Sequence, residues 1–400
     1  MSTSLFAAVE MAPRDPILGL TEAFNADARA SKVNLGVGVY YGNDGKIPLL
    51  AAVKAAEKSR LEAQPPRGYQ PIEGPAAYNQ AVQKLLFGAD SPIVAEGRVV
   101  TLQSLGGTGA LKVGADYLRR LLPQAEVYIS DPSWENHRQL FEAAGFTVKD
   151  YPYYDAATRG VDFAAMLAAL KALPAGAIVV LHACCHNPTG ADLTPEQWQQ
   201  VVQAVGERGL VAFLDIAYQG FADGIEPDAA AVRLFAAAGL QFFVASSFSK
   251  SFSLYGERVG ALSIVTASRD ESARVLSQVK RVVRTNYSNP PTHGGAIVAA
   301  VLTSGELRQM WEDELAGMRD RIRAMRGGLV KKLATRGVRQ DFSFVTVQRG
   351  MFSYTGLTAA QVERLKTEHS IYAVSTGRIC LAALNDGNLD YVADAIASVL

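Results

Sequence analysis

The run Phe242-Phe243-Val244-Ala245-Ser246 is followed at once by Ser247-Phe248-Ser249-Lys250-Ser251-Phe252. Its apolar part predicts a buried strand, and Lys250 is the only charged residue between Gln241 and Tyr255. Burial takes water away from an ammonium group and lowers its pKa, which leaves a neutral amine able to attack a carbonyl. Lys250 is therefore a candidate for Schiff-base formation.

Other short apolar runs share the character of this strand. With it, the candidate strands are 98–103, 126–130, 177–182, 210–215, 242–246 and 259–265. They are rich in Val, Ile, Leu and Phe with little polar alternation, which is typical of strands covered on both faces and so of a mostly parallel sheet. Segments of helical pattern lie between them. The sequence therefore predicts an α/β fold with a mostly parallel central sheet between helices.

The length of 400 residues predicts two domains. A long charged helical pattern runs from 306 to about 336, and the segment before 48 looks like an extended arm. We expect a large domain over 48–315. We expect the arm, residues 1–47, to combine with residues 316–400 in a smaller α/β domain built from both chain ends.

Bulk composition excludes some classes of partner. Lys plus Arg and Asp plus Glu both number 39, so the net charge offers no bulk attraction to nucleic acid or anionic membranes. The odd count of three cysteines is poor material for a disulfide framework and favours a reducing compartment. The first residues lack an apolar core of signal-peptide length, and no apolar stretch reaches the roughly 20 residues that span a bilayer. We expect a cytoplasmic protein.

Two more charges stand alone in apolar surroundings. Asp215 is the only charged residue between Gly209 and Ala222, and Arg378 is the only one between residues 370 and 385. Burying an unpaired ion costs roughly several kcal/mol, so these residues could pair with opposite charges on a ligand. Internal salt bridges, or positions at strand ends on the surface, explain the same pattern equally well.

The cluster Gly106-Gly107-Thr108-Gly109 follows a predicted strand and opens a predicted helix. Free backbone N–H groups and the positive end of the helix would form a site for an anion such as phosphate. The spacing is neither GxGxxG nor GxxxxGK[ST], which argues against a nucleotide-binding dehydrogenase or a P-loop protein. A tight strand-to-helix turn is the more common explanation of such a cluster taken alone.

Four further residues have a functional explanation, an ordinary one, or both. Trp134 could stack on a planar ring or belong to the core. Asn187, fixed by the following proline, could direct its amide into a cleft. Arg258 could bind phosphate or form a surface ion pair. Arg284 fits a solvated basic helix end.

The segment 182–190 (HACCHNPTG) contains histidines and cysteines, yet it has no CxxC or HExxH spacing. Strand alternation would place His182, Cys184 and His186 on one face and Cys185 on the other. These features make a zinc site improbable. The arginines on the long predicted helix are interpreted as solvated surface; they are Arg319, Arg321, Arg323 and Arg326.

Taken together, these segments resemble the class I aminotransferases, and within them the aspartate and aromatic-amino-acid subgroup of fold-type I pyridoxal-phosphate enzymes. The similarity runs from the segment 15–20 (DPILGL) to Arg378. The segments that carry it are 34–40 (NLGVGVY), 106–110 (GGTGA), 186–190 (HNPTG), 215–218 (DIAY), 247–250 (SFSK), Arg258 and 286–291 (NYSNPP). Their order and number make the resemblance highly specific.

The resemblance implies pyridoxal 5'-phosphate as cofactor and gives the isolated charges their roles. Lys250 would hold the cofactor aldehyde as an internal aldimine and later carry the proton between substrate and cofactor. Asp215 would pair with the pyridine nitrogen and keep it protonated, so that the ring withdraws electrons. Tyr218 and Asn187 would hydrogen-bond the phenolic oxygen, and Trp134 would stack on the ring.

The resemblance also implies how the phosphate is held. Gly107, Thr108, Ser247 and Arg258 would bind it, and Tyr69 would reach it from a second subunit, so a homodimer with active sites at the interface is expected. Many aspartate aminotransferases have serine at the position of Gly106. The phosphate site would then lack one hydroxyl here but keep its backbone donors.

For the substrate, the resemblance implies that Arg378 pairs with the α-carboxylate, helped by Asn187 and the backbone at Gly38. His137 and His182 would support Asp215 and the face of the ring. Arg284 matches the residue that binds the distal carboxylate of aspartate or glutamate from the neighbouring subunit.

The residues beside the substrate site point toward a second kind of donor. Val39, Tyr41 and Ile47 resemble the aromatic-specific members more than the aspartate-specific ones. We therefore predict ping-pong transamination of tyrosine, phenylalanine and aspartate with 2-oxoglutarate. The alternatives are a dedicated aspartate aminotransferase, a β-lyase or decarboxylase on the same fold, and a non-catalytic binding module.

Overall fold

The computed structural model describes residues 4–12 and 17–400 of the chain. Within these residues the largest sheet has seven strands in the order β2-β10-β9-β8-β7-β3-β4. Its strands are β2 (Val99–Leu105), β3 (Glu126–Asp131), β4 (Thr147–Pro152), β7 (Ile178–His182), β8 (Val211–Ile216), β9 (Phe242–Ser247) and β10 (Val259–Val265). All neighbours are parallel except that β10 runs antiparallel to β2 and β9. The mostly parallel α/β sheet is confirmed.

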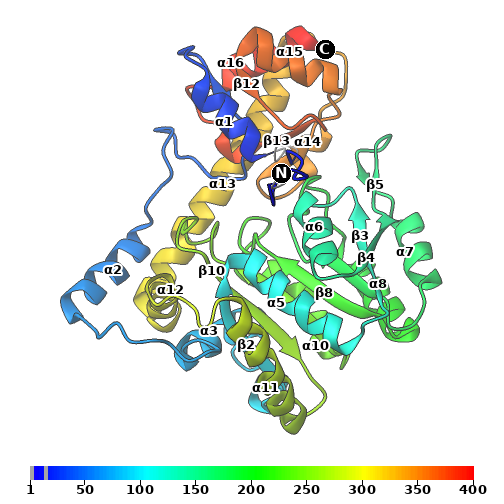
Figure 1. Cartoon of the computed structure of the whole chain (residues 1–400). Coiled ribbons are helices and arrows are strands. Elements are labelled where there is room, and N and C mark those ends of the chain that lie inside the picture. Colours follow the sequence, from blue (N-terminus) through cyan, green and yellow to red (C-terminus); the bar gives the residue numbers. More distant parts are fainter. Residues whose placement is uncertain (1–3, 13–16) are drawn as a thin grey trace.

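Helices cover both faces of this sheet, as Figure 1 shows. One face is covered by α5 (Gly106–Leu121), α6 (Glu135–Ala143) and α11 (Arg269–Asn286). The other is covered by α3 (Ala76–Phe87), α7 (Phe163–Ala172), α8 (Pro195–Arg208), α10 (Ala230–Ala237) and α12 (His293–Thr303). Along β8, Phe213 packs in one core while Ala212 and Leu214 pack in the other, because successive side chains of a strand point to opposite faces.

The local signals in the sequence act as expected at several boundaries. Thr194 caps α8: its Oγ1 accepts from the Gln197 N–H at 3.2 Å, and the Gln197 side chain accepts from the Thr194 N–H at 2.9 Å. Strand β4 escaped the sequence analysis because its segment, TVKDYP, carries charges on an edge strand. An edge strand has one neighbour and tolerates polar side chains.

A second body lies above the sheet in Figure 1. The long helix α13 (Gly305–Thr335) runs from beside the sheet into this body. There the two ends of the chain meet, since β1 (Val33–Asn34) pairs in parallel with β12 (Ile371–Tyr372). The other elements of this body are α1 (Leu18–Ala26), α14 (Phe344–Val347), β11 (Phe352–Tyr354), α15 (Ala359–His369), β13 (Arg378–Cys380), η1 (Leu381–Ala383) and α16 (Leu389–Val399).

The remaining elements are peripheral. They are α2 (Ala51–Ala63), α4 (Pro92–Ala95), α9 (Ile225–Asp228), β5 (Tyr154–Asp155) and β6 (Gly160–Val161). Of the helices in the described ranges, none combines the length and hydrophobicity needed to cross a lipid bilayer. The part of the resemblance that falls on Asp15 and Pro16 lies outside the described residues.

Candidate active site

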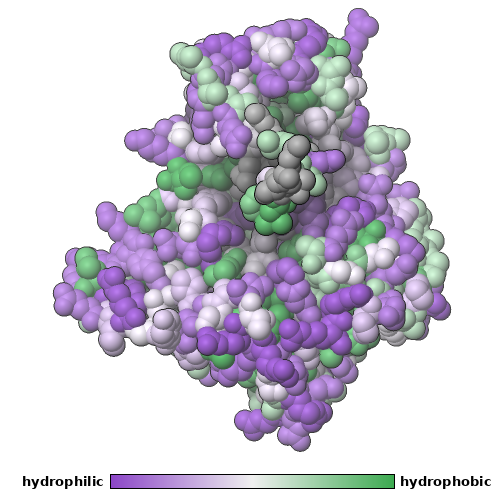
Figure 2. Space-filling view, viewed as in Figure 1, coloured by the Kyte–Doolittle hydropathy of each residue, from purple (hydrophilic) through white to green (hydrophobic). Residues whose placement is uncertain are grey.

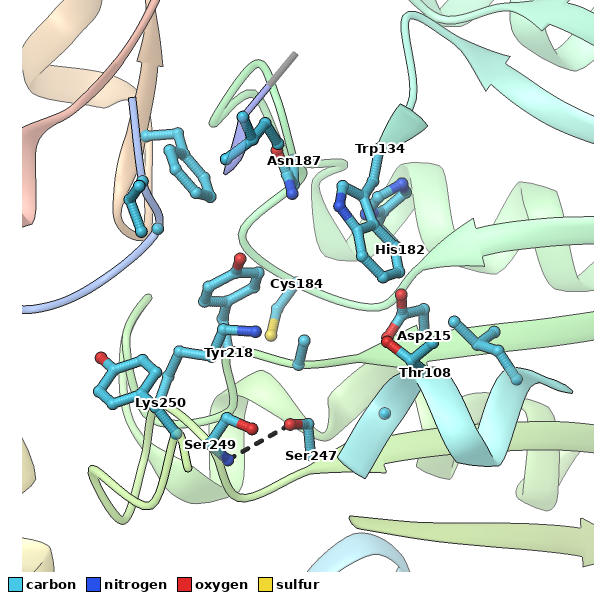
Figure 3. Close-up of a pocket in the computed structure, with 18 of the residues that line it drawn as sticks. Thr108, Trp134, His182, Cys184, Asn187, Asp215, Tyr218, Ser247, Ser249 and Lys250 are labelled. Atoms are coloured by element: carbon cyan, nitrogen blue, oxygen red, sulfur yellow. Dashed lines mark hydrogen bonds between the residues drawn. The ribbon is translucent and has the colours of Figure 1, made fainter. Parts of the chain in front are cut away.

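A cavity of about 350 Å³ lies at the carboxyl ends of the parallel strands. His182 ends β7, Asp215 lies near the end of β8 and Ser247 ends β9, so three neighbouring strands deliver polar side chains to one edge. In α/β sheets this edge is the usual place for a ligand. Figure 3 shows these side chains, together with Lys250 and Tyr218, converging on one space.

Lys250 enters the cavity from the loop that joins β9 to β10. That loop is too short for a parallel crossover, so β10 returns antiparallel and holds both ends of the loop. Burial lowers the pKa of Lys250 from 10.5 to about 8; the charge of Asp215 opposes this change, and Arg258 adds to it. The Nζ atom lies 4.9 Å from the centre of the Tyr218 ring. A substantial neutral fraction of this amine therefore exists near neutral pH.

Asp215 is the fixed negative charge of the cavity. Burial raises its pKa, but the hydrogen bond from His137, together with the His182 and Lys250 side chains, outweighs burial and lowers the pKa below its ordinary value. The His137 Nε2 to Asp215 Oδ2 distance is 2.9 Å. His137 Nδ1 lies 3.0 Å from Ser133 Oγ. Burial and the neighbouring His137 lower the pKa of His182 to about 3, so His182 is neutral.

The start of α5 and Arg258 form a cradle for an anion. Gly106 has φ +69, and a Cβ there would lie 2.7 Å from an Arg258 Nη atom. Glycine adopts this backbone angle without strain, and the lack of a side chain lets the guanidinium approach closely. Gly107, Thr108 and Ser247 line the same cavity. Helix N–H groups and a guanidinium suit the phosphate of a cofactor.

Arg378 forms the opposite wall of the cavity and is only 1% exposed. Its Nη1 donates to Asn187 Oδ1 at 3.0 Å and its Nη2 to the Gly36 carbonyl at 2.6 Å. Its buried Nε has no partner among the described residues. Since unpaired buried donors are costly, this guanidinium is arranged to receive an acceptor such as a substrate carboxylate.

The sequence matches the family model for aminotransferases of class I and II over residues 30–396. The chain belongs to this family. It is 71% identical to a Pseudomonas aeruginosa protein named aspartate aminotransferase, over 99% of this chain and all of that one. It is 53% identical to the Escherichia coli aromatic-amino-acid aminotransferase, with the same coverage. A Burkholderia pseudomallei aromatic-amino-acid aminotransferase, solved covalently bound to pyridoxal phosphate, shares 72% identity and a TM-score of 0.97 over the whole of both chains.

Most site residues expected of this aminotransferase line the one cavity. Those brought together are Gly38, Gly107, Thr108, Trp134, Asn187, Asp215, Tyr218, Ser247, Lys250, Arg258 and Arg378. Trp134 lies edge-on to His137, with ring centres 5.2 Å apart. The Gly36 carbonyl holds Arg378 in place. The expected contact of the Gly38 backbone with a substrate carboxylate stays a prediction.

Tyr69 and Arg284 do not reach this cavity within the chain. The Tyr69 side chain is 95% exposed. Arg284 lies on α11, beside a separate basic hollow formed with Arg120, Lys280 and Arg281. Both residues were expected to act across a subunit interface, and this expectation stays a prediction.

Sequence reasoning missed Phe352 and Tyr255, which also line the cavity. The Phe352 ring lies 4.4 Å from the Arg378 guanidinium and edge-on to Tyr218. The Tyr255 hydroxyl accepts from the Tyr40 N–H at 2.9 Å. Neither has a local signal, because an aromatic residue in an apolar segment looks like core until its neighbours are known.

The interpretation of the α13 arginines as solvated surface is wrong for three of the four. Arg326 is 2% exposed, and Arg319 and Arg321 are partly buried. Arg319 donates to the Gly220 carbonyl at 3.0 Å, and Arg321 donates to the Leu384 carbonyl at 2.6 Å. Long side chains on a helix that joins two bodies can span to backbone acceptors on both.

Strand β7 ends at His182, so strand alternation does not extend over 183–186. The rings of His182 and His186 nevertheless lie 4.2 Å apart, and His182 and Cys184 both line the cavity. Potential metal-ligand atoms of Cys184, Cys185 and Asp228 lie within 4.8 Å of one another. However, the Asp228 oxygens accept four backbone N–H bonds, so this carboxylate is already engaged in holding a turn. The donors are Gly220, Ala222, Asp223 and Gly224.

Proposed function

We propose that the protein is a pyridoxal-phosphate-dependent aminotransferase that exchanges amino groups between aromatic amino acids or aspartate and 2-oxoglutarate. The observation that carries the proposal is the meeting of Lys250, Asp215 and Arg378 in one cavity. An amine, a carboxylate and a guanidinium are the groups needed to hold an aldehyde cofactor, its ring nitrogen and a substrate carboxylate.

The residues of this cavity fit the cofactor. The start of α5 and Arg258 offer donors for a phosphate, and Asp215 offers a buried negative charge for a protonated ring nitrogen. When bound, pyridoxal phosphate supplies an aldehyde that condenses with amines and a ring that accepts electrons. Trp134 provides an aromatic face for the ring to stack on. The relative solved with this group attached covalently supports the same assignment.

Lys250 would serve as both the attachment point and the proton carrier. With its pKa lowered to about 8, the amine can give up and take back a proton near neutral pH. A group whose pKa lies near the operating pH is the most effective general acid and base. Asp215 is hydrogen-bonded to His137, and its negative charge stays in place without taking this proton.

Arg378 would bind and orient the α-carboxylate common to all the substrates. Asn187 holds one of its nitrogens and the Gly36 carbonyl holds another, so the guanidinium is fixed before substrate arrives. Preorganised donors of this kind reduce the entropy lost when a substrate is oriented.

The donor range is inferred from the relatives and from the residues around the site. Relatives at 71% and 53% identity are named for aspartate and for aromatic amino acids, respectively. Arg284 would take the distal carboxylate of aspartate, and the partly buried Val39 and Tyr41 would accept an aromatic ring once Arg284 has moved away. Because one site serves both half-reactions, ping-pong kinetics are expected. The 71% relative favours a dedicated aspartate enzyme as the second candidate.

We further propose a homodimer in which Tyr69 and Arg284 complete the partner's site. Several large apolar side chains of the N-terminal segment are exposed; they are Leu5, Phe6, Val9 and Met11. Apolar residues gather where this segment lies on the face shown in Figure 2. Exposed apolar patches mark contact surfaces. The division into 48–315 and 1–47 plus 316–400, and the cytoplasmic location, remain part of this proposal.

A donor panel tests the proposal. The holoenzyme is mixed with aspartate, tyrosine, phenylalanine or tryptophan and 2-oxoglutarate, and the 2-oxo acid formed and the amine form of the cofactor are measured. Turnover of both aspartate and tyrosine supports dual use, whereas turnover of aspartate alone supports the dedicated enzyme. Release of ammonia and pyruvate together with the donor's side-chain group would instead indicate a β-lyase, and release of carbon dioxide with an amine product would indicate a decarboxylase.

A further inference from the structure

Arg326 on α13 is a buried guanidinium that bonds both ends of one loop. Its Nη1 donates to the Val345 carbonyl at 2.8 Å, and its Nη2 donates to the carbonyls of Gly350 at 2.8 Å and Phe352 at 2.6 Å. All three of these hydrogen bonds go to backbone carbonyls rather than to a carboxylate. Burying an unpaired ion is costly, so a cation kept here must be matched by these carbonyl dipoles. Arg326 thus fixes the path of residues 345–352.

The tip of this loop is pressed against the segment that carries Asn187. Gly350 has φ +76, and a Cβ there would lie 2.5 Å from the Cys185 Cβ. The Arg349 N–H donates to the Gly190 carbonyl at 2.7 Å. The loop therefore packs closely on residues 185–190, and a shift of the loop would be felt on both of its sides.

Phe352, at the end of the loop, packs on the proposed carboxylate-binding residues. A Cβ on Gly38 would lie 2.6 Å from the Phe352 ring, so the ring occupies the space beside Gly38. The ring also lies 4.4 Å from the Arg378 guanidinium. Strand β11 pairs antiparallel with β13, where Tyr354 faces Arg378 in the register. The position of Phe352 therefore sets the wall against which Arg378 is held.

We propose that Arg326 is a positioning residue for substrate binding: by holding the Phe352 carbonyl it fixes the ring that packs against Arg378. This inference rests on the proposed function, since it takes Arg378 as the group that binds the α-carboxylate. Arg326 touches neither substrate nor cofactor and acts through Phe352. The ordinary explanation, that Arg326 only stabilises the small body, predicts a loss of stability with no change in substrate affinity.

The matched control is Arg323, which lies on the same helix. It is exposed and donates to the Ala222 carbonyl at 2.7 Å and to Asp223 at 2.9 Å. Neither partner lines the cavity. R323M therefore removes an arginine and a backbone hydrogen bond from α13. Asp223 also pairs with Arg349 of the loop, but R323M leaves that ion pair and the three carbonyl hydrogen bonds of Arg326 in place.

The experiment compares R326M, R326K and R323M as holoenzymes. The dissociation constant of 3-phenylpropanoate, an unreactive carboxylate, is measured by calorimetry, and kcat/KM is measured for aspartate and phenylalanine. R326M should raise the dissociation constant of 3-phenylpropanoate by about tenfold, since coupling through packed residues is of this order. The loss in kcat/KM should be equal for both donors, because they share the α-carboxylate. R326K should be intermediate, since one ammonium cannot span three carbonyls, and R323M should match the parent.

A double-mutant cycle with F352L tests the route of the effect. If Arg326 acts through Phe352, R326M should add little to the weakening already present in F352L. Additive losses, or an R326M holoenzyme with a lower Tm and an unchanged dissociation constant, would overturn the proposal. Should R326M fail to fold, R326K decides in the same way. A parent enzyme that binds the carboxylate but transfers no amino group would refute the proposed function instead.

Discussion

Replacing Asp215 by asparagine tests the electrostatic core of the site with little change of shape. The carboxylate is buried and held at 2.9 Å by His137 Nε2, and an asparagine Oδ1 can accept the same bond. The fold should therefore survive, with a Tm close to that of the parent. What is lost is the negative charge, whose neighbours His137, His182 and Lys250 all favour its ionised form.

The size of the loss follows from the interaction that disappears. A hydrogen bond to a charged group contributes about 1.5–3 kcal/mol, and opposite charges 4 Å apart interact by about 4 kcal/mol at an effective dielectric constant of about 20. A loss of about 3–4 kcal/mol in the transition state lowers kcat/KM by about 100- to 1000-fold. Because Asp215 opposes the lowering of the Lys250 pKa, the variant should also have a Lys250 pKa below about 8.

Stopped-flow absorbance of the first half-reaction measures this loss without interference from product release. Aspartate or tyrosine is mixed with holoenzyme, and the conversion of the cofactor to its amine form is followed. D215E, which keeps the charge but moves it, is the control and should lose less activity than D215N. A D215N enzyme that reacts within about threefold of the parent rate would show that the charge of Asp215 is not needed for catalysis.

Three other changes test separate parts of the site. R284L should lower kcat/KM for aspartate far more than for phenylalanine, and equal losses would contradict the proposed role of Arg284. In the cofactor-free protein, K250M should raise the free energy of unfolding at pH 7 by up to about 3 kcal/mol, because a pKa lowered from 10.5 to about 8 on folding carries that cost below pH 8. The folded protein binds fewer protons than the unfolded chain between these values, so the parent gains stability as pH rises through them; urea titrations should show the K250M advantage fade above about pH 10.5. Finally, G106A should cost about 1–2 kcal/mol of cofactor affinity, from a residue at φ +69 facing Arg258, measured by titrating the cofactor-free protein with pyridoxal phosphate.

Much of the fold could be predicted because its signals are local. The strand that carries Asp215 and the strand that precedes Lys250 are largely apolar runs. Such runs are typical of strands buried on both faces. The cap at Thr194 and the turn at Gly106 are set by neighbouring residues. Strand β10 has the same composition as its parallel neighbours, so its reversed direction was not visible in the sequence. Its direction depends on the short loop before it, which is a matter of topology.

The site residues were recognisable from the sequence where a charge stood alone in an apolar segment. This signal identified Lys250, Asp215 and Arg378. Burying a charge is costly, so an isolated charge in an apolar segment indicates an opposite charge or a hydrogen-bonding group nearby. Phe352 and Arg326 gave no such signal. One is an aromatic among apolar residues and the other an arginine among arginines on a charged helix.

The sequence by itself determined most strands of the central sheet, the start of α8 and the solitary charges, because each depends on residues close together along the chain. The tertiary structure alone decided which of those charges share a cavity and which arginines of α13 are buried. Phe352 and Arg378 come from different strands, and Arg326 from a helix that spans both bodies. Contacts between distant segments depend on how packed surfaces fit together, and no local pattern of residues encodes that fit.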